Sequence, residues 1–135
     1  MPFRMKSILA LVKNTFNLEN SKTKTKAHYQ NWDSEYSIPE DIDIVVNATS
    51  IGLFPDIQAR VAVKQESLRP SLVVADIIPN PPRTRFVEEA TARGCQVIDG
   101  LGMLVNQGVI SIKYWTGIDV DAAVMRKTVE DIFGV

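Results

Sequence analysis

Length, composition and charge restrict the class of protein before any motif is considered. The chain has 135 residues, of which 45% are hydrophobic and 23% charged, so one ordinary globular domain is expected and a disordered chain is excluded. A formal net charge of −1 gives no general attraction to nucleic acid or to an anionic membrane surface, and no apolar run approaches the length of a membrane span.

The first 40 residues differ in character from the rest of the chain. An apolar run at 8–12 lacks the length and the cleavage site of a signal peptide, and we therefore predict a strand there. From Asn14 to Glu40 the chain is polar, and the alternating lysines within 21–26 are typical of a solvated loop or helix face. A phosphate-binding role for these lysines stays open, because their spacing does not specify one.

From residue 41 onward, strand and helix signals alternate. Short β-branched runs at 43–47, 72–76 and 96–98 predict strands buried on both faces, as in a parallel sheet. Between the last two runs a helix is predicted, with Thr84 as its N-cap and Gly94 after its C-terminus. Strand, helix and strand at this spacing form a βαβ unit, so the expected fold is a parallel α/β domain.

Two more helices are predicted near the C-terminus. The first runs from about Met103 to Trp115, and the second begins after Asp119 or Asp121 and continues to Phe133. Helical spacing places certain residues of each helix on one stripe: Met103, Gln107, Ile110 and Tyr114 on the first, and Met125, Val129 and Ile132, expected to face inward, on the second.

Each predicted strand ends in a specialised turn. The first strand runs into Asn-Ala-Thr-Ser-Ile-Gly at 47–52, the second into a proline-rich turn at 76–82, and the third into Asp-Gly-Leu-Gly-Met-Leu at 99–104. The carboxyl ends of parallel strands meet at one edge of the sheet, where doubly wound folds bind their ligands. We therefore expect a ligand site at this edge.

Two single residues have more than one interpretation. Gln107 is a polar amide on an otherwise apolar stripe, so it is either a satisfied core or surface glutamine or a contact to a ligand at the strand ends. Cys95 is the chain's one cysteine, which excludes an internal disulfide and agrees with a reducing cytoplasm. It precedes a strand, and we interpret it as a small core hydrophobe.

The motifs at 47–52 and 99–108 resemble those of the shikimate dehydrogenase family, and Trp-Thr-Gly at 115–117 also matches the family's C-terminal pattern. The similarity covers 41–134, whereas 1–40 match poorly. The resemblance implies that 41–135 are the C-terminal part of a dinucleotide-binding domain. The implied α/β fold is an incomplete Rossmann-like doubly wound parallel sheet, flanked by helices, in a single domain.

The resemblance also implies an activity and the residues that serve it. Family members transfer hydride reversibly between a nicotinamide cofactor, NADP or NAD, and 3-dehydroshikimate or the related quinate pair. Gln107 would hydrogen-bond a hydroxyl or carboxylate of the substrate. By match, the cofactor would be bound by Ala48, Thr49, Ser50, Ile77, Gly100, Met103 and Leu104.

Several features of the family are missing from this sequence. No glycine-rich loop joins a strand to a helix, and nothing matches the substrate domain that supplies the family's catalytic lysine and aspartate. No catalytic residue is therefore assigned, and the isolated chain is expected to be inactive. Pro79 stands where many members have a substrate-contacting tyrosine, which leaves room for quinate or another relative of shikimate. If 9–15 is the second strand, Asn14 stands where family members have an arginine that binds the 2′-phosphate of NADP. The choice between NADP and NAD is therefore open.

A missing central strand has a consequence for the sheet. The strand before the glycine loop lies at the centre of the doubly wound order, and without it the strand at 43–47 has an unpaired apolar edge. We predict that the run at 8–12 occupies the vacant place or that two chains share strands in a homodimer. A complementing substrate-domain chain is the further partner that the family implies.

Two other classes of function compete with an oxidoreductase. The first is a non-catalytic remnant, or a binding or regulatory module, that keeps the fold without the reaction. The second is a hydrolase that uses His28 as a base, but no nucleophile-elbow motif surrounds any serine. No set of metal ligands is expected.

Overall fold

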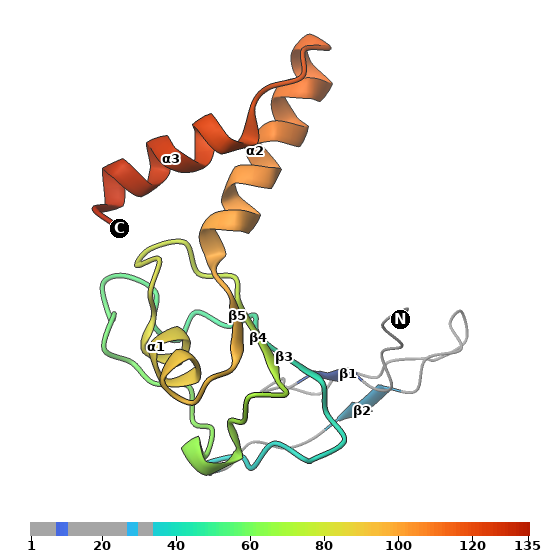
Figure 1. Cartoon of the computed structure of the whole chain (residues 1–135), viewed down its shortest axis with the longest axis vertical. Coiled ribbons are helices and arrows are strands. Elements are labelled where there is room, and N and C mark those ends of the chain that lie inside the picture. The colour runs from blue at the N-terminus through green and yellow to red at the C-terminus, as the bar shows by residue number, and fades with distance from the viewer. Residues whose placement is uncertain (1–7, 11–26, 30–33) are drawn as a thin grey trace.

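The computed structural model of the chain describes residues 8–10, 27–29 and 34–135. Figure 1 shows the elements of this part in chain order. They are β1 (Ile8–Ala10), β2 (Ala27–Tyr29), β3 (Ile44–Asn47), a 3-10 turn η1 (Gln65–Ser67), β4 (Val73–Asp76), α1 (Arg85–Ala92), β5 (Gln96–Ile98), α2 (Gly100–Thr116) and α3 (Ala122–Phe133).

A three-stranded parallel sheet in the order β3-β4-β5 organises the fold. Ile44 pairs with Val73 in the first ladder, and Val74 pairs with Val97 in the second. α1 lies between β4 and β5 in the chain and packs on both strands, so these elements form the predicted βαβ unit. The predicted α/β fold and the three predicted strands are confirmed.

The hydrophobic core lies between α1 and one face of this sheet. Alternate residues of a strand share a face, and Val74 at the centre of the sheet is fully buried beside Phe86 of α1. Thr84 caps α1 as predicted, because its hydroxyl accepts the N–H of Val87 at 3.3 Å. Cys95 is buried in the core, in agreement with its interpretation as a small hydrophobe.

In the described part of the chain, no helix covers the opposite face of the sheet, which corrects the prediction that the strands are buried on both faces. Val46 of β3 and Ile98 of β5 are exposed by more than a third of their surface. Figure 1 shows α2 leaving the end of β5 and projecting away from the sheet together with α3. Of the described helices, α1 alone makes extensive contact with the strands, and it covers one face only.

The inward orientation predicted for three residues of α3 is partly wrong, and the stripe identified on α2 is largely exposed. Ile110 and Tyr114 of α2 are exposed, Tyr114 at 85% of its surface, and Ile132 of α3 is 74% exposed. The two helices pack on each other through another face, where a Cβ on Gly108 would lie 2.7 Å from Met125. Met125 and Val129 are half-buried, so their predicted inward orientation agrees with the structure.

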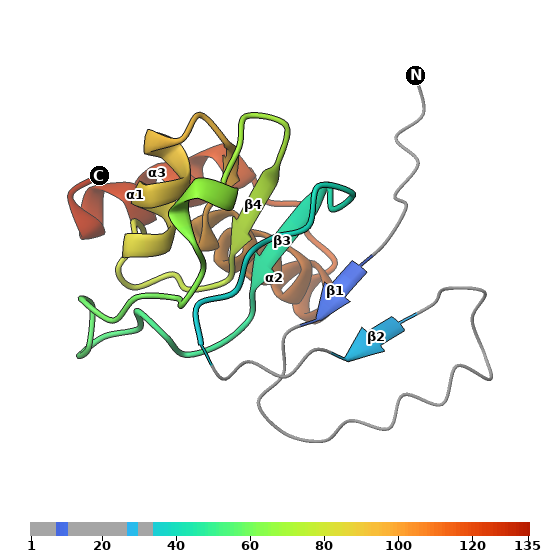
Figure 2. The ribbon, with the colours of Figure 1, turned by 90° about the horizontal axis from the view of Figure 1, so that it is seen from below.

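β1 and β2 form a separate two-stranded parallel sheet. β1 falls within the strand range predicted at 8–12, of which residues 11 and 12 lie outside the described residues. Figure 2 shows β1 beside β3. No backbone ladder joins these two strands in the described part. β1 therefore lies beside β3 without hydrogen-bonding to its free edge.

The described residues contain neither a helix long and apolar enough to cross a membrane nor a cluster of three or more side chains suited to hold a metal ion.

Candidate functional site

The turns after β3, β4 and β5 meet at one edge of the sheet, which we call the rim. The N–H of Phe54 donates to the carbonyl of Asn80 at 3.1 Å and so joins the first turn to the second. Gly100 joins the third turn to the second, because a Cβ there would lie 2.1 Å from the carbonyl oxygen of Ile78. The expected gathering of three turns at the carboxyl edge is therefore observed.

A buried pair of polar side chains connects the ends of β3 and β4. Asn47 and Asp76 are register partners, and the Asn47 Nδ2 donates to both Asp76 carboxylate oxygens at 3.2 Å. Asp76 also accepts the N–H of Ile78 at 3.0 Å and the hydroxyl of Thr84 at 2.7 Å. Asn47, Asp76 and Thr84 are only 4%, 2% and 1% exposed. These hydrogen bonds to the Asp76 carboxylate thus all come from uncharged donors inside the protein.

Thr49 is turned toward this pair rather than toward the solvent. Its hydroxyl donates to the Asn47 Oδ1 at 2.7 Å and accepts the N–H of Ile51 at 3.1 Å, and its own N–H donates to the same Asn47 oxygen at 3.2 Å. By family match, Thr49 was expected to bind the cofactor. In the structure the Thr49 hydroxyl shapes the loop, and Ala48 and Ser50 are the exposed residues on either side of it.

The other residues expected in the site lie on the second and third turns and on the start of α2. Ile77 is half-buried, and its N–H donates to the carbonyl of Asn47 at 3.1 Å. Gly100 is buried, Met103 is half-buried, and Leu104 and Gln107 are exposed on the first two turns of α2. All the predicted site residues therefore belong to segments that begin at the rim.

The sequence-based prediction missed Asp76 and Thr84. The available signal was an acidic residue at the end of a strand with an apolar interior, since a buried carboxylate requires hydrogen-bond donors nearby. Asn47, at the end of the neighbouring strand, was the obvious candidate partner.

A second carboxylate ties α3 to the rim. Asp99 caps α2 by accepting the N–H of Gly102 at 3.1 Å, and the Arg126 Nη2 of α3 donates to Asp99 at 2.8 Å. Burial by itself raises the pKa of Asp99, but the hydrogen bonds and charge of Arg126 and the Gly102 amide together hold this pKa below its ordinary value. Arg126 also pairs with Glu130 at 2.7 Å.

The lowered pKa of Asp99 predicts an acid-dependent loss of stability. A carboxylate whose pKa is depressed by folding stabilises the native state above its unfolded value of 3.8, and this stability is lost as the pH falls through the folded pKa. Urea unfolding between pH 7 and pH 2.5 should therefore show a steeper acid decline in the native chain than in Asp99→Asn. Asp131→Asn is the control, because the pair of Asp131 with Lys127 is largely exposed on both sides. Equal acid profiles for Asp99→Asn and the native chain would contradict the prediction.

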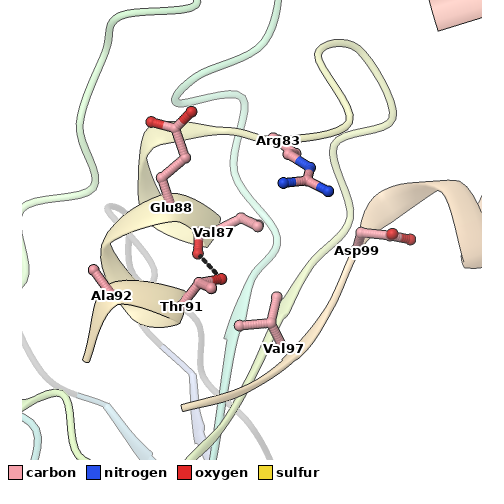
Figure 3. A pocket seen from close by; sticks show the side chains of 7 residues that line it. All are labelled: Arg83, Val87, Glu88, Thr91, Ala92, Val97 and Asp99. Atoms are coloured by element: carbon pink, nitrogen blue, oxygen red, sulfur yellow. Dashed lines mark hydrogen bonds between the residues drawn. The ribbon is translucent and has the colours of Figure 1, made fainter. Parts of the chain in front are cut away.

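An open hollow lies between α1 and β5, on the covered side of the sheet. Its volume is about 500 Å³, and it reaches the rim at Asp99. Figure 3 shows Arg83 between α1 and Asp99, and the Thr91 hydroxyl bonded to the carbonyl of Val87 within α1. None of the residues expected to bind the cofactor or the substrate lines this hollow. The residues that do are Arg83, Val87, Glu88, Thr91, Ala92, Val97 and Asp99.

Comparison with known proteins identifies the family. The model of the shikimate 5′-dehydrogenase C-terminal domain matches residues 100–130. The chain is 34% identical to the NADP⁺ shikimate dehydrogenase of Methanococcus aeolicus over 84% of this chain and 40% of that protein. Among solved structures it matches the ligand-free 5-ketofructose reductase of Gluconobacter sp. strain CHM43, at 51% identity and a TM-score of 0.77, over 84% of this chain and 41% of the reductase.

A second solved structure, a shikimate dehydrogenase in complex with NADP⁺, matches at 41% identity and a TM-score of 0.66 over 69% of this chain and 32% of that enzyme. The chain thus spans less than half the length of the relatives that it matches. Family model, identities and shared fold agree with the motifs at 47–52 and 99–108, and this chain belongs to the shikimate/quinate dehydrogenase family as a counterpart of the C-terminal part of its members.

Proposed function

We propose that this chain is the nicotinamide-cofactor half of a family oxidoreductase that transfers hydride between NADP(H) or NAD(H) and a shikimate- or quinate-like compound. The observation that carries the proposal is the rim, where three strand-end turns are fixed to one another at the carboxyl edge of a parallel sheet. This edge is where doubly wound folds bind dinucleotides. The solved shikimate dehydrogenase relative in complex with NADP⁺ supports the same assignment.

The residues of the rim fit the nicotinamide end of such a cofactor better than its pyrophosphate end. Half-buried Ile77 and Met103 offer apolar surface for a flat ring, and Ala48 and Ser50 leave exposed backbone that a ligand can approach. Leu104 and the backbone of Gly100 would border the same surface. The sequence holds no glycine-rich turn for the pyrophosphate. When bound, the cofactor carries the hydride, and these residues orient it and exclude water.

Gln107 is proposed to bind the substrate. Its carboxamide has both donors and an acceptor, which suits a hydroxyl or a carboxylate, and it is exposed one helical turn after Met103. No residue of this chain is proposed as the general acid. That group would come from the substrate domain, because the relatives are more than twice as long as the matched region.

A partner polypeptide is proposed for the complete site. Two uncovered apolar surfaces support it, namely the open face of the sheet with Val46 and Ile98, and the exposed stripe of α2 with Ile110 and Tyr114. Parallel sheets are normally covered on both faces, and exposed apolar surface of this kind marks interaction sites. We favour a complementing substrate-domain chain over a homodimer, since a second copy would supply no catalytic acid. We also propose that the protein is located in the cytoplasm.

A second candidate substrate is 5-ketofructose. The identity of this chain to the Gluconobacter reductase is 51%, against 34% and 41% for the two shikimate dehydrogenases described above. Pro79 supplies no side-chain hydrogen bond where many family members contact their substrate through a tyrosine. The first feature favours an uncharged polyhydroxy ketone, whose carbonyl would accept the hydride in the same position, and the second leaves room for a substrate other than shikimate.

The experiment that tests the proposal is a titration of the purified chain with NADPH, NADP⁺, NADH and NAD⁺, followed by melting curves. A ligand at 100 times its Kd stabilises the native state by about 2.7 kcal/mol, so binding raises Tm by several degrees. Turnover should be absent, because a missing acid/base group costs roughly 10²–10⁴-fold in rate.

Activity is then measured after co-expression with the unmatched part of the Gluconobacter reductase, using 5-ketofructose, shikimate and quinate. The reductase's own matched region, co-expressed in the same way, is the positive control. Turnover with this chain identifies the substrate class. No melting shift with any cofactor, together with no turnover where the control is active, would instead support the non-catalytic module.

A further inference from the structure

We propose that Asp76 and Asn47 are positioning residues, whose buried pair sets the turns after β3 and β4 in the conformation that the cofactor meets. The inference rests on the proposed function for what binds at these turns. How well the two turns are ordered is a property of the chain itself and can be measured without any ligand.

The pair is placed by the sheet rather than by local sequence. Asn47 and Asp76 are 29 residues apart, and the parallel register brings them side by side at the last position of β3 and β4. Register partners project to the same face of a sheet, so the amide of one meets the carboxylate of the other. The contact is bidentate, with 3.2 Å from the Asn47 Nδ2 to each carboxylate oxygen.

Asp76 determines which way the Asn47 amide points. A carboxylate only accepts hydrogen bonds, so it holds the Nδ2 of Asn47 and leaves the Oδ1 on the other side. That oxygen accepts the N–H and the hydroxyl of Thr49, and the Thr49 hydroxyl in turn accepts the N–H of Ile51. A chain of hydrogen bonds with one fixed direction thus runs from Asp76 through the turn after β3.

The same carboxylate orders the turn after β4. Its Oδ1 accepts the N–H of Ile78 at 3.0 Å, and its Oδ2 accepts the hydroxyl of Thr84, the residue that caps α1. Because the site excludes water, each of these bonds is stronger than in solvent, and a donor that lost its acceptor would remain unsatisfied. One side chain therefore couples two of the three turns on which cofactor residues are proposed.

The test uses a charge-conserving swap. Asp76→Asn removes a carboxylate that Ile78 and Thr84 share, and Asn47→Asp brings two carboxylates together. In the double variant Asn47→Asp/Asp76→Asn, the amide and the carboxylate have exchanged places. The Thr84 hydroxyl can rotate to accept as well as donate, so it can satisfy the new amide.

The readout is amide hydrogen exchange of the ligand-free chain, observed by NMR at Thr49 and Ile78, with Ala90 in the core helix as the reporter of global opening. Relative to Ala90, each single variant should exchange about tenfold faster at Thr49 and Ile78. Asn47→Asp places two carboxylates in contact, and Asp76→Asn leaves one acceptor oxygen where two were shared by three donors. The double variant should be about fivefold slower than either single, the coupling expected of contacting residues.

The double variant could restore the native exchange rate at Ala90 and leave exchange at Thr49 and Ile78 as fast as in the single variants. That result would assign the pair to stability alone and overturn the proposal. Single variants with native exchange at both turns would overturn it as well. If the single variants fail to fold, Thr49→Val serves instead, since it removes one link of the chain at a half-buried site. It should speed exchange at Ile51 and leave Ile78 unchanged, and any other result contradicts the proposal.

A cofactor titration separates this inference from the proposed function. If the function holds, the NADPH Kd should rise about tenfold in each single variant and recover in the double, in parallel with the exchange rates. If the native chain binds no cofactor while the exchange pattern is as expected, the proposed function fails and the positioning of the turns stands.

Discussion

Replacing Gly100 by alanine should lower the free energy of unfolding by about 3 kcal/mol or more. Overpacking usually costs about 1–3 kcal/mol, and here the added methyl group meets rigid backbone atoms. The added Cβ would lie 2.1 Å from the carbonyl oxygen of Ile78, 2.3 Å from its carbonyl carbon and 2.8 Å from the nitrogen of Pro79. These are backbone atoms, which cannot rotate aside, so either the turn after β4 or the start of α2 has to move. The expected fall in Tm is about 10 °C or more.

Gly102→Ala is the matched control for this substitution. Gly102 lies two residues further into α2, where a Cβ would meet only the ends of Arg126 and Asp99, at 3.6 and 3.9 Å. Alanine is about 0.5–1 kcal/mol better than glycine inside a helix, so Tm should be unchanged or slightly higher. Thermal denaturation of both variants measures this difference in Tm. A Gly100→Ala protein as stable as Gly102→Ala would mean that the turns after β4 and β5 do not touch as described.

Truncation of Phe86 is expected to have an effect of similar size. Phe86 is 2% exposed and lies on the face of α1 that packs against the sheet. Loss of a buried phenyl ring costs about 3–5 kcal/mol, since the surrounding core fills the cavity only in part. Urea unfolding of Phe86→Ala should show a much lower midpoint with an unchanged m-value.

Phe54→Ala provides the comparison, because the same side chain is removed from a position that is 65% exposed. The rim hydrogen bond of Phe54 is made by its backbone N–H, which alanine keeps, and removal of an exposed side chain usually changes stability by less than about 0.5 kcal/mol. If both variants unfold at similar urea concentrations, the core does not lie between α1 and the sheet.

The strands, the helices and the edge that bears the site were predictable because their signals are local. The β-branched runs around Val45, Val74 and Val97 marked the sheet, and Thr84 marked the start of α1. The specialised turns after these strands indicated the rim, since parallel strands end on the same side. The periodicity of α2 and α3 does not show which surface packs against each helix face. Ile132 is consequently exposed where an inward orientation was expected, and Tyr114 on the stripe of α2 is exposed as well.

The strands β3–β5, the three helices and the motifs of the shikimate/quinate dehydrogenase family could be recognised from the amino-acid sequence alone, whereas β2 and η1 could not. Only the tertiary structure showed that Asp76 meets Asn47, that the Thr49 hydroxyl turns inward and that one face of the sheet is open. This division follows from the sequence separation over which each interaction acts. Backbone propensity, capping and turn chemistry act over a few residues, whereas a bond between residues 29 apart exists only once the strand register has aligned them.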